Sequence, residues 1–150
     1  MTALRSLLCF LLLLLVSLAT PARAEPAVAG KPKLTDEQLM DLVQRQTFRY
    51  FWDFAHPVSG LAREDSVYLE RCAIGGSGFG VMGIVVGVKR GYITREEGAR
   101  HLLKMARFLR DRTTRYHGAW SHWVDGTTGK TLDFGDVDDG GDIVETAFLV

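Results

Sequence analysis

The sequence predicts an all-α fold, because helical patterns of two kinds follow one another along the chain. Two amphipathic patterns each begin with a capping box, in which a threonine and a glutamine or glutamate three residues later satisfy free backbone N–H groups. The boxes are Thr35 with Gln38 and Thr94 with Glu97. Between them, residues 79–88 form an almost unbroken apolar run. Amphipathic and wholly apolar helices in succession predict a two-layer arrangement of helices.

The first 24 residues predict a cleavable secretory signal peptide. Arg5 precedes an apolar run over residues 7–18, and residues 22–24 supply a small-x-small cleavage site. The run is shorter than the roughly 20 apolar residues with which a helix spans a bilayer. We therefore expect a periplasmic or secreted protein with no membrane segment after cleavage near Ala24, and with residues 25–33 as a flexible leader.

The first two helices of the domain are predicted over residues 34–56 and 79–91. The first has apolar residues at helical spacing and stops before Pro57, since the residue before a proline avoids helical geometry. The second is apolar on every side, so we expect it to be buried on every side. Its glycines Gly80, Gly83 and Gly87 lie along one side, where we expect another backbone to approach closely.

Two further helices are predicted, one from the second capping box to residue 109 and one that starts within residues 138–142. Between them, residues 116–136 change to an alternating pattern with turn signals, which predicts a loop or short hairpin. The last pattern continues to Val150 without a capping residue. We therefore expect residues 34–150 to be the N-terminal part of a longer domain, truncated at Val150.

Charge and cysteine usage narrow the class of protein. The whole chain has 18 basic and 18 acidic residues, and Arg5 and Arg23 fall in the signal peptide, which leaves a slightly acidic mature chain. That balance gives no reason to expect nucleic-acid binding. Cys9 also lies in the signal peptide, so Cys72 alone remains and no internal disulfide is possible.

Six carboxylates crowd into residues 133–145. Asp142 and Glu145 share one face of the last predicted helix, because residues three apart are neighbours there. Crowded acids raise one another's pKa, which suits proton transfer. The structural alternative is that Asp139 caps this helix, while Asp142 and Glu145 favour its positive end.

Aromatic side chains lie close to these acids in the sequence. Trp120, Trp123 and Tyr116 could stack on the apolar faces of sugar rings, with His122 as a hydrogen-bond donor to their polar edges. The alternative is that these aromatic residues form a lid over the core. The first interpretation predicts a sugar-binding subsite.

Three other motifs are weaker, so we expect no metal and no cofactor. A calcium-loop pattern from Asp136 lacks ligands at Gly140 and Ala147. A dinucleotide-type glycine pattern at residues 78–83 has no predicted strand before it. His117 and His122 have zinc-like spacing but no further ligands near them in the sequence.

Four segments of the chain form a recognisable series, namely residues 48–53, residues 78–80, residues 122–129 and residues 140–149. In this order they resemble the glucoamylase-like family that includes the bacterial β-1,2-glucanases. The last segment is the most specific of the four. The resemblance runs from about residue 35 to residue 150 and matches the N-terminal portion of a catalytic domain of this family. The chain departs from the family pattern at residues 71–73, where small uncharged residues are expected.

The resemblance implies an (α/α)6 toroid, in which an inner ring of helices presents a pocket at one end. Asp142 and Glu145 match acidic positions at this pocket, and Asp138 is expected to join them as a catalytic residue. The family inverts the anomeric centre, which needs two carboxyl groups roughly 6.5–9.5 Å apart. Neighbours on one helix face have Cβ atoms only about 5–6 Å apart. A further catalytic carboxylate is therefore expected beyond Val150.

These expectations combine into an exported, endo-acting, inverting glycoside hydrolase that cleaves β-1,2-glucan. Trp120 and Trp123 would line its pocket, and His122 would hydrogen-bond a sugar hydroxyl. One alternative is an exo-acting β-glucosidase or a transglycosylase on the same scaffold. Alternatives from other classes are a non-catalytic periplasmic glucan-binding protein and a purely structural helical domain. The expected partner is a glucan oligosaccharide or polysaccharide.

Overall fold

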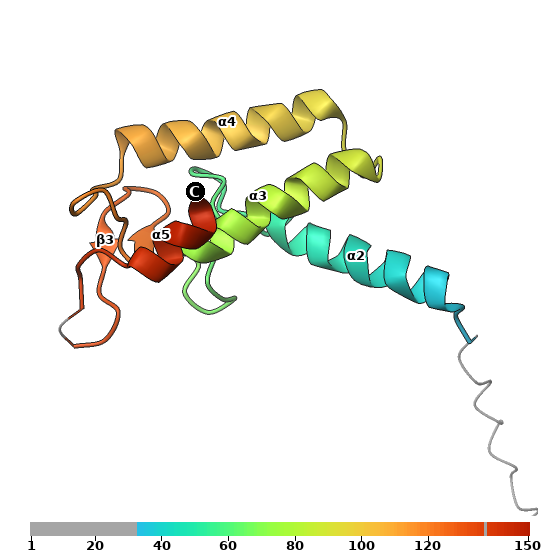
Figure 1. Ribbon diagram of the computed structural model, residues 1–150, viewed down its shortest axis with the longest axis horizontal. Coiled ribbons are helices and arrows are strands. Elements are labelled where there is room, and N and C mark those ends of the chain that lie inside the picture. The colour runs from blue at the N-terminus through green and yellow to red at the C-terminus, as the bar shows by residue number, and fades with distance from the viewer. Residues whose placement is uncertain (1–32, 137) are drawn as a thin grey trace, which may run out of the picture. The chain divides into compact units, whose positions relative to one another are not determined.

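The computed structural model describes residues 33–136 and 138–150. The predicted signal peptide and residues 25–32 of the predicted leader lie outside this part of the chain. Among the described residues, no helix has both the length and the hydrophobicity needed to cross a membrane. The elements in chain order are α2 (Asp36–Trp52), β1 (Arg71–Ala73), α3 (Ile74–Lys89), α4 (Arg95–Asp111), β2 (Trp123–Asp125), β3 (Thr131–Leu132) and α5 (Ile143–Leu149) (Figure 1).

Both predicted capping boxes are present. At α2, the Thr35 hydroxyl accepts from the Gln38 N–H, and the Gln38 side chain accepts from the Thr35 N–H at 3.0 Å. At α4, Thr94 and Glu97 form the same pair of bonds. Each box satisfies N–H groups that the first helical turn would otherwise leave free. These two helix starts are therefore confirmed.

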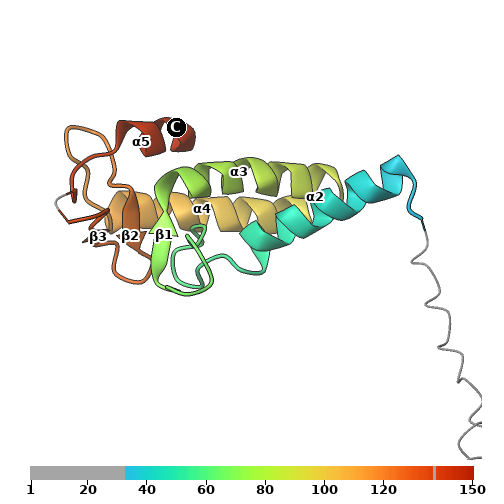
Figure 2. The same cartoon turned by 90° about the horizontal axis from the view of Figure 1, so that it is seen from below.

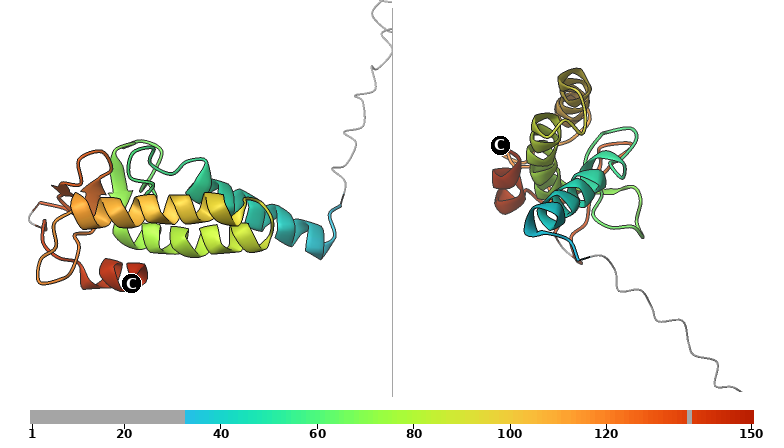
Figure 3. Two further views of the ribbon diagram at one scale, coloured as in Figure 1. Left: turned by 90° about the horizontal axis from the view of Figure 1, so that it is seen from above. Right: turned by 90° about the vertical axis from the view of Figure 1, so that its right-hand side faces the viewer.

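Helix α3 is the central element of the described chain, with α2, α4 and α5 packed along it (Figures 1 and 3). It begins at Ile74, five residues before the predicted apolar run. The expectation that it is buried on every side is wrong for this part of the chain. Phe79 and Met82 are 56% and 64% exposed, because the three neighbouring helices cover only part of its circumference.

The glycines of α3 accept close neighbours, although these are not the ones predicted. A Cβ at Gly80 or Gly83 would lie 3.1 Å from the ring of Phe51 on α2, and one at Gly87 would overlap the ring of Phe48. At these three positions the close neighbour is therefore an aromatic side chain and not the predicted backbone. A backbone does approach at Gly78, where a Cβ would overlap the carbonyl of Phe148 in α5.

A small antiparallel sheet, in the order β1-β2-β3, accompanies the helices. Strands β2 and β3 form the hairpin predicted within residues 116–136. Strand β1 was not predicted, so the expectation that no strand precedes α3 is wrong. The described chain is rich in helix but also contains this small sheet, so it is not all-α. Strands of two or three residues are too short to show an alternating pattern in the sequence.

The sheet lies at the end of the domain where α3 begins and α4 ends (Figure 2). One face of the sheet joins the core, since Cys72 of β1 and Val124 of β2 are fully buried. Ile74, Ile84 and Met105 continue this core between α3 and α4. The opposite face, which carries Arg71 and Trp123, therefore points away from the core.

A buried histidine attaches the chain after α2 to the sheet. His56 is 1% exposed, and its Nδ1 accepts from the N–H groups of Val58 and Ser59. Its Nε2 lies 3.2 Å from the carboxylate of Glu70, which precedes β1. The Glu70 carbonyl in turn accepts from the N–H of Gly126, in the turn after β2. This network fixes the end of the sheet at which Arg71 pairs with Asp125, opposite the end that carries the site described below.

Candidate active site

Two of the three acids predicted for catalysis lie where α3 and α5 begin, beside the start of β2. Asp142 is the residue before α5, and Glu145 lies in the first turn of that helix. His122 directly precedes β2, and its carbonyl accepts from the N–H of Ile74, the first residue of α3. The positive ends of two helices therefore face this region, which favours carboxylates in their ionised form.

Asp142 is the N-cap of α5. Its Oδ1 accepts from the N–H groups of Val144 and Glu145 at 2.9 and 3.0 Å. Its Oδ2 lies 2.9 Å from Nδ1 of His122, and both side chains are about three-quarters buried. The alternative in which Asp139 caps this helix is therefore wrong, because the helix begins three residues later than that cap would require.

The pKa of Asp142 is lowered from its ordinary value. Partial burial is the largest single influence and would raise this pKa. The Glu145 N–H, the His122 side chain and the Val144 N–H together outweigh it, because each stabilises the charged carboxylate. The expectation that crowded acids raise one another's pKa is therefore wrong for Asp142, since its immediate neighbours are donors. A carboxylate whose pKa is lowered is ionised at neutral pH and accepts hydrogen bonds.

Glu145 reaches across from α5 to the start of α3. Its Oε2 accepts from the N–H of Gly75 at 2.8 Å. The residue before α3 is Ala73, whose side chain cannot cap a helix, so Glu145 supplies that cap from another helix. A Cβ at Gly75 would lie within about 3.0 Å of the Glu145 carboxylate. Glycine at this position therefore allows the carboxylate to approach.

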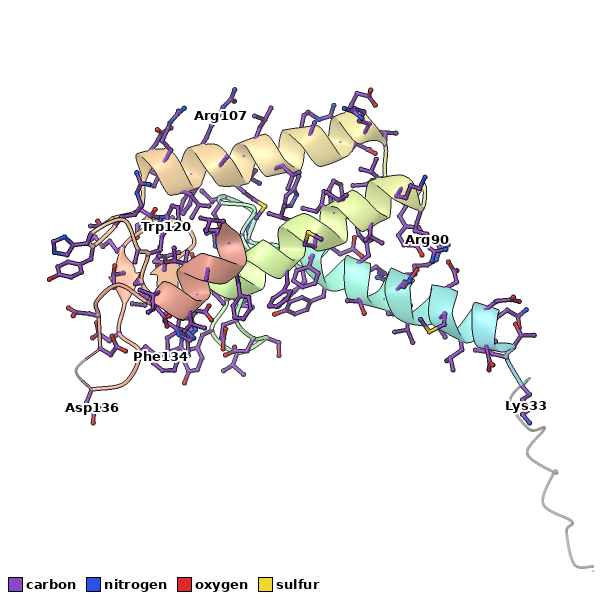
Figure 4. The ribbon with its side chains drawn as sticks, in the orientation of Figure 1. Lys33, Arg90, Arg107, Trp120, Phe134 and Asp136 are labelled. Carbon is purple, nitrogen blue, oxygen red and sulfur yellow. The ribbon has the colours of Figure 1, made fainter. Side chains whose placement is uncertain are left out.

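Asp138 lies apart from this pair. It belongs to the exposed loop between β3 and α5, and its carbonyl accepts from the N–H of Phe134 at 2.7 Å. Its carboxylate has no hydrogen bond or ion pair to any other residue that the structure describes. Asp136, in the same loop, points away from the domain (Figure 4). The structure thus joins Asp142 to His122, and it joins Glu145 to the start of α3. The catalytic role of Asp138 stays a prediction.

Three rings form an aromatic cluster next to Asp142, namely His122, Trp123 and Phe134. Phe134 stacks on His122 with 3.9 Å between ring centroids and meets Trp123 edge-on at 4.8 Å. Phe134 is 42% exposed, so the cluster is open to solvent on one side (Figure 4). The sequence analysis singled out His122 and Trp123 but missed Phe134, although it lies inside the acidic segment.

Trp120 belongs to a different environment. Its ring packs against the core and lines an apolar cavity of about 440 Å³ together with Leu102, Met105 and Leu149. Its Nε1 donates to the hydroxyl of Thr113 at 2.8 Å. In the described part of the chain, no ring contact joins Trp120 to the aromatic cluster. These contacts favour the core-lid alternative for Trp120, and its contact with a sugar stays a prediction.

The described residues contain no group of three or more histidine, cysteine, aspartate or glutamate side chains that could hold a metal ion. His117 and His122 do not act together. The ring of His117 contacts Tyr116, whereas His122 is bonded to Asp142. The side chains that form the site are therefore carboxylates, a histidine and aromatic rings.

The chain is similar to proteins that act on β-1,2-linked glucans. Over 118 residues it is 55% identical to an exo β-1,2-glucooligosaccharide sophorohydrolase, acting at the non-reducing end, from Parabacteroides distasonis. It is 49% identical to an endo-β-1,2-glucanase from Chitinophaga pinensis, solved with sophorotriose and glucose, with a TM-score of 0.74. It is 60% identical to a candidate glucoamylase from Bacteroides uniformis, with a TM-score of 0.75. No model of a protein family matches the chain.

These matches include most of this chain but a minor part of each relative. The curated sophorohydrolase matches 77% of the chain, which spans 16% of that protein's length. Each of the two solved structures matches 78% of the chain, which spans 29% and 30% of their lengths. The relationship predicted from the four sequence segments is confirmed over this shared part.

Proposed function

Because this chain is a relative of the glucoamylase-like β-1,2-glucanases over most of its length, we propose that the protein is a glycoside hydrolase that cleaves β-1,2-glucan. One observation carries the proposal, namely its similarity to two hydrolases whose names specify β-1,2-linked glucans. The geometry supports it, since an ionised carboxylate, a second carboxylate and an open aromatic cluster lie together.

Asp142 acts as a proton or hydrogen-bond acceptor in this proposal. Its lowered pKa keeps it ionised at neutral pH, which suits a base or a group that orients a sugar hydroxyl rather than an acid. An ionised carboxylate can only accept, so Nδ1 of His122 carries the proton in their shared bond. The other ring nitrogen, Nε2, has no hydrogen-bond partner among the described residues and is left for a sugar hydroxyl.

Glu145 has one carboxylate oxygen engaged with α3. Its other oxygen, Oε1, has no hydrogen-bond partner among the described residues and is left for substrate. An inverting reaction needs two carboxyl groups roughly 6.5–9.5 Å apart, farther than neighbours on one helical turn. We therefore assign one of the two catalytic carboxyl groups to this site and the other to a part of the protein outside these 150 residues. In the same proposal, α2 to α5 belong to an (α/α)6 toroid.

We propose endo-acting cleavage, and one observation favours an exo-acting alternative. The Chitinophaga enzyme is named an endo-β-1,2-glucanase, whereas the Parabacteroides enzyme is named an exo-acting sophorohydrolase. The sizes of the products distinguish these modes. An endo-acting enzyme releases a range of oligosaccharides early, whereas a sophorohydrolase releases disaccharide throughout the reaction.

The first experiment measures reducing-sugar release from linear β-1,2-glucan by the full-length mature protein. Linear β-1,3-glucan, β-1,4-glucan and starch are the controls. Release from the β-1,2 polymer alone is the expected result. A folded protein that binds β-1,2-glucan without releasing sugar would overturn hydrolysis in favour of a glucan-binding protein, and one that ignores all four polymers would overturn both.

Variants then test the site itself. Asp142→Asn keeps a residue that caps helices well, and it removes the negative charge. We expect its kcat to fall by about 10²–10⁴-fold, the usual contribution of acid–base catalysis. Asp136→Asn is the matched control, because this acid lies in the same segment and points away from the domain. Equal kcat in the two variants would remove Asp142 from the mechanism.

Export to the periplasm or medium is part of the proposal and has its own test. Cell fractionation should find the protein outside the cytoplasm, and N-terminal sequencing of the mature protein should begin at Glu25. A cytoplasmic protein that retains Met1 would contradict the predicted signal peptide without affecting the proposed activity.

A further inference from the structure

Arg71 is held between two aromatic rings on the face of the sheet that points away from the core. Its guanidinium carbon lies 4.2 Å from the ring centroid of Tyr68 and 4.1 Å from that of Trp123. It lies within residues 71–73, for which the family resemblance led us to expect small uncharged residues.

The sheet register explains why Arg71 reaches Trp123. Arg71 pairs with Asp125 and Ala73 pairs with Trp123 across the antiparallel strands β1 and β2. Arg71 and Trp123 are therefore diagonal neighbours on one face, within reach of long side chains. Cys72, between Arg71 and Ala73, points to the other face and is fully buried.

The N–H groups of the Arg71 guanidinium are unpaired within the described residues. No carbonyl accepts from them there, and no carboxylate lies within 4.0 Å. Arg63 gives the contrast, because it also stacks on a ring but donates to the carbonyls of Leu69 and Phe54 at 2.8 and 3.0 Å. Arg63 thus ties loops together, whereas Arg71 presents a fixed plane of free donors.

Arg71 and the acid pair are connected through the aromatic cluster. Trp123 contacts both Arg71 and Phe134, Phe134 stacks on His122, and His122 is bonded to Asp142. The cluster therefore extends from Asp142 at one end to Arg71 at the other. Tyr68, beyond Arg71, is 57% exposed and lengthens this surface.

The charges near Arg71 indicate a neutral ligand. Asp125 is the partner of Arg71 across the sheet, so the two side chains lie on the same face. The pKa of Asp65 is lowered mainly by the N–H groups of Tyr68 and Val67, and to a smaller extent by the charge of Arg71, which places this acid nearby as well. These carboxylates balance the guanidinium and would repel an anionic ligand. Sugar hydroxyls accept hydrogen bonds from a guanidinium without adding negative charge.

We propose that Arg71, held between Tyr68 and Trp123, is a glucan-binding residue that donates hydrogen bonds to the hydroxyls of a sugar unit away from the cleaved bond. This inference rests on the proposed function and extends its site beyond the residues identified from the sequence. The rings on either side fix the plane of the guanidinium, so its donors are arranged before the sugar binds. The aromatic cluster supplies apolar surface for the sugar units between Arg71 and Asp142.

The test compares Arg71→Ala with Arg45→Ala in the full-length mature protein on linear β-1,2-glucan. Arg45 is the matched control, since its guanidinium also lies over a ring, that of Tyr92 at 4.5 Å, but on α2 and paired with Asp41. We expect Arg71→Ala to raise KM about tenfold with kcat within about twofold, because uniform binding is lost. Arg45→Ala should leave KM within about twofold.

Arg71→Lys separates charge from geometry. Lysine keeps the positive charge but lacks the planar set of donors, so it should recover only part of the lost affinity. Thermal unfolding by circular dichroism checks that each variant folds. If Arg71→Lys restores the parent KM, charge alone acts and the hydrogen-bonding role is overturned.

The remaining outcomes separate this inference from the proposed function. A parent enzyme that hydrolyses β-1,2-glucan, with a folded Arg71→Ala variant of unchanged KM, overturns the role of Arg71 only. A rise in KM that is equal for Arg45→Ala and Arg71→Ala also overturns it. A folded parent that neither binds nor hydrolyses glucan overturns both proposals.

Discussion

Replacing Gly78 by alanine should detach α5 from α3 and thereby disrupt the candidate site. The added Cβ would overlap the Phe148 carbonyl and lie 2.9 Å from Cα of Leu149. A backbone cannot rotate away as a side chain can, so either helix must shift. Overpacking of this kind costs about 1–3 kcal/mol. Alanine regains about 1 kcal/mol through its higher helix propensity. A net loss of up to about 2 kcal/mol in the free energy of unfolding is therefore expected.

Gly83→Ala in the same helix is the matched control. It gains the same helix propensity, but its Cβ meets only the ring of Phe51, at 3.1 Å. We expect its stability to stay within about 1 kcal/mol of the parent. Urea unfolding followed by circular dichroism measures both variants. A Gly78→Ala protein as stable as Gly83→Ala would refute the steric reasoning and the α3–α5 contact on which it depends.

Three further predictions concern single side chains. Asp142→Ala should lower the free energy of unfolding by about 1 kcal/mol in urea unfolding, with Asp142→Asn close to the parent, because only alanine removes the cap. Burial lowers the pKa of His101, although its Nε2 bonds the Gly60 carbonyl. As the pH falls below 6.5, the unfolded chain therefore takes up a proton at this histidine that the folded chain excludes. The free energy of unfolding, complete above pH 6.5, should decrease below this pH, and it should decrease less in His101→Gln. Burial raises the pKa of the Cys72 thiol to about 12, so a maleimide at pH 8 should label it only after unfolding, and rapid labelling of folded protein would contradict its burial.

The helix starts could be predicted from the sequence because their causes are local. In each capping box, residues three apart in the chain supply both partners of the hydrogen bonds. The start of α5 is local as well, since Asp142 accepts from the N–H groups of Val144 and Glu145, two and three residues later. Asp139 was the expected cap, but the two glycines that follow it, Gly140 and Gly141, favour a helix start only after Asp142.

Features that depend on distant residues could not be predicted. Strand β1 exists because β2 pairs with it, and its three residues show no pattern of their own. The cap that Glu145 supplies to α3 and the position of Arg71 beside Trp123 likewise arise from tertiary packing. Arg71 is unexpected from the family resemblance, but its neighbours Tyr68 and Trp123 are determined by the fold.

The hydrogen bond between Gly75 and Glu145 also determines when the site forms. It joins residues 70 positions apart, and contacts of such long range form late in folding, since closing a long loop costs entropy. Both acids are carried by α5, so they enter the site together when this helix docks and leave together when it opens. The amide hydrogen of Gly75 exchanges with solvent only in the open state. Its exchange rate would therefore report how often the site comes apart.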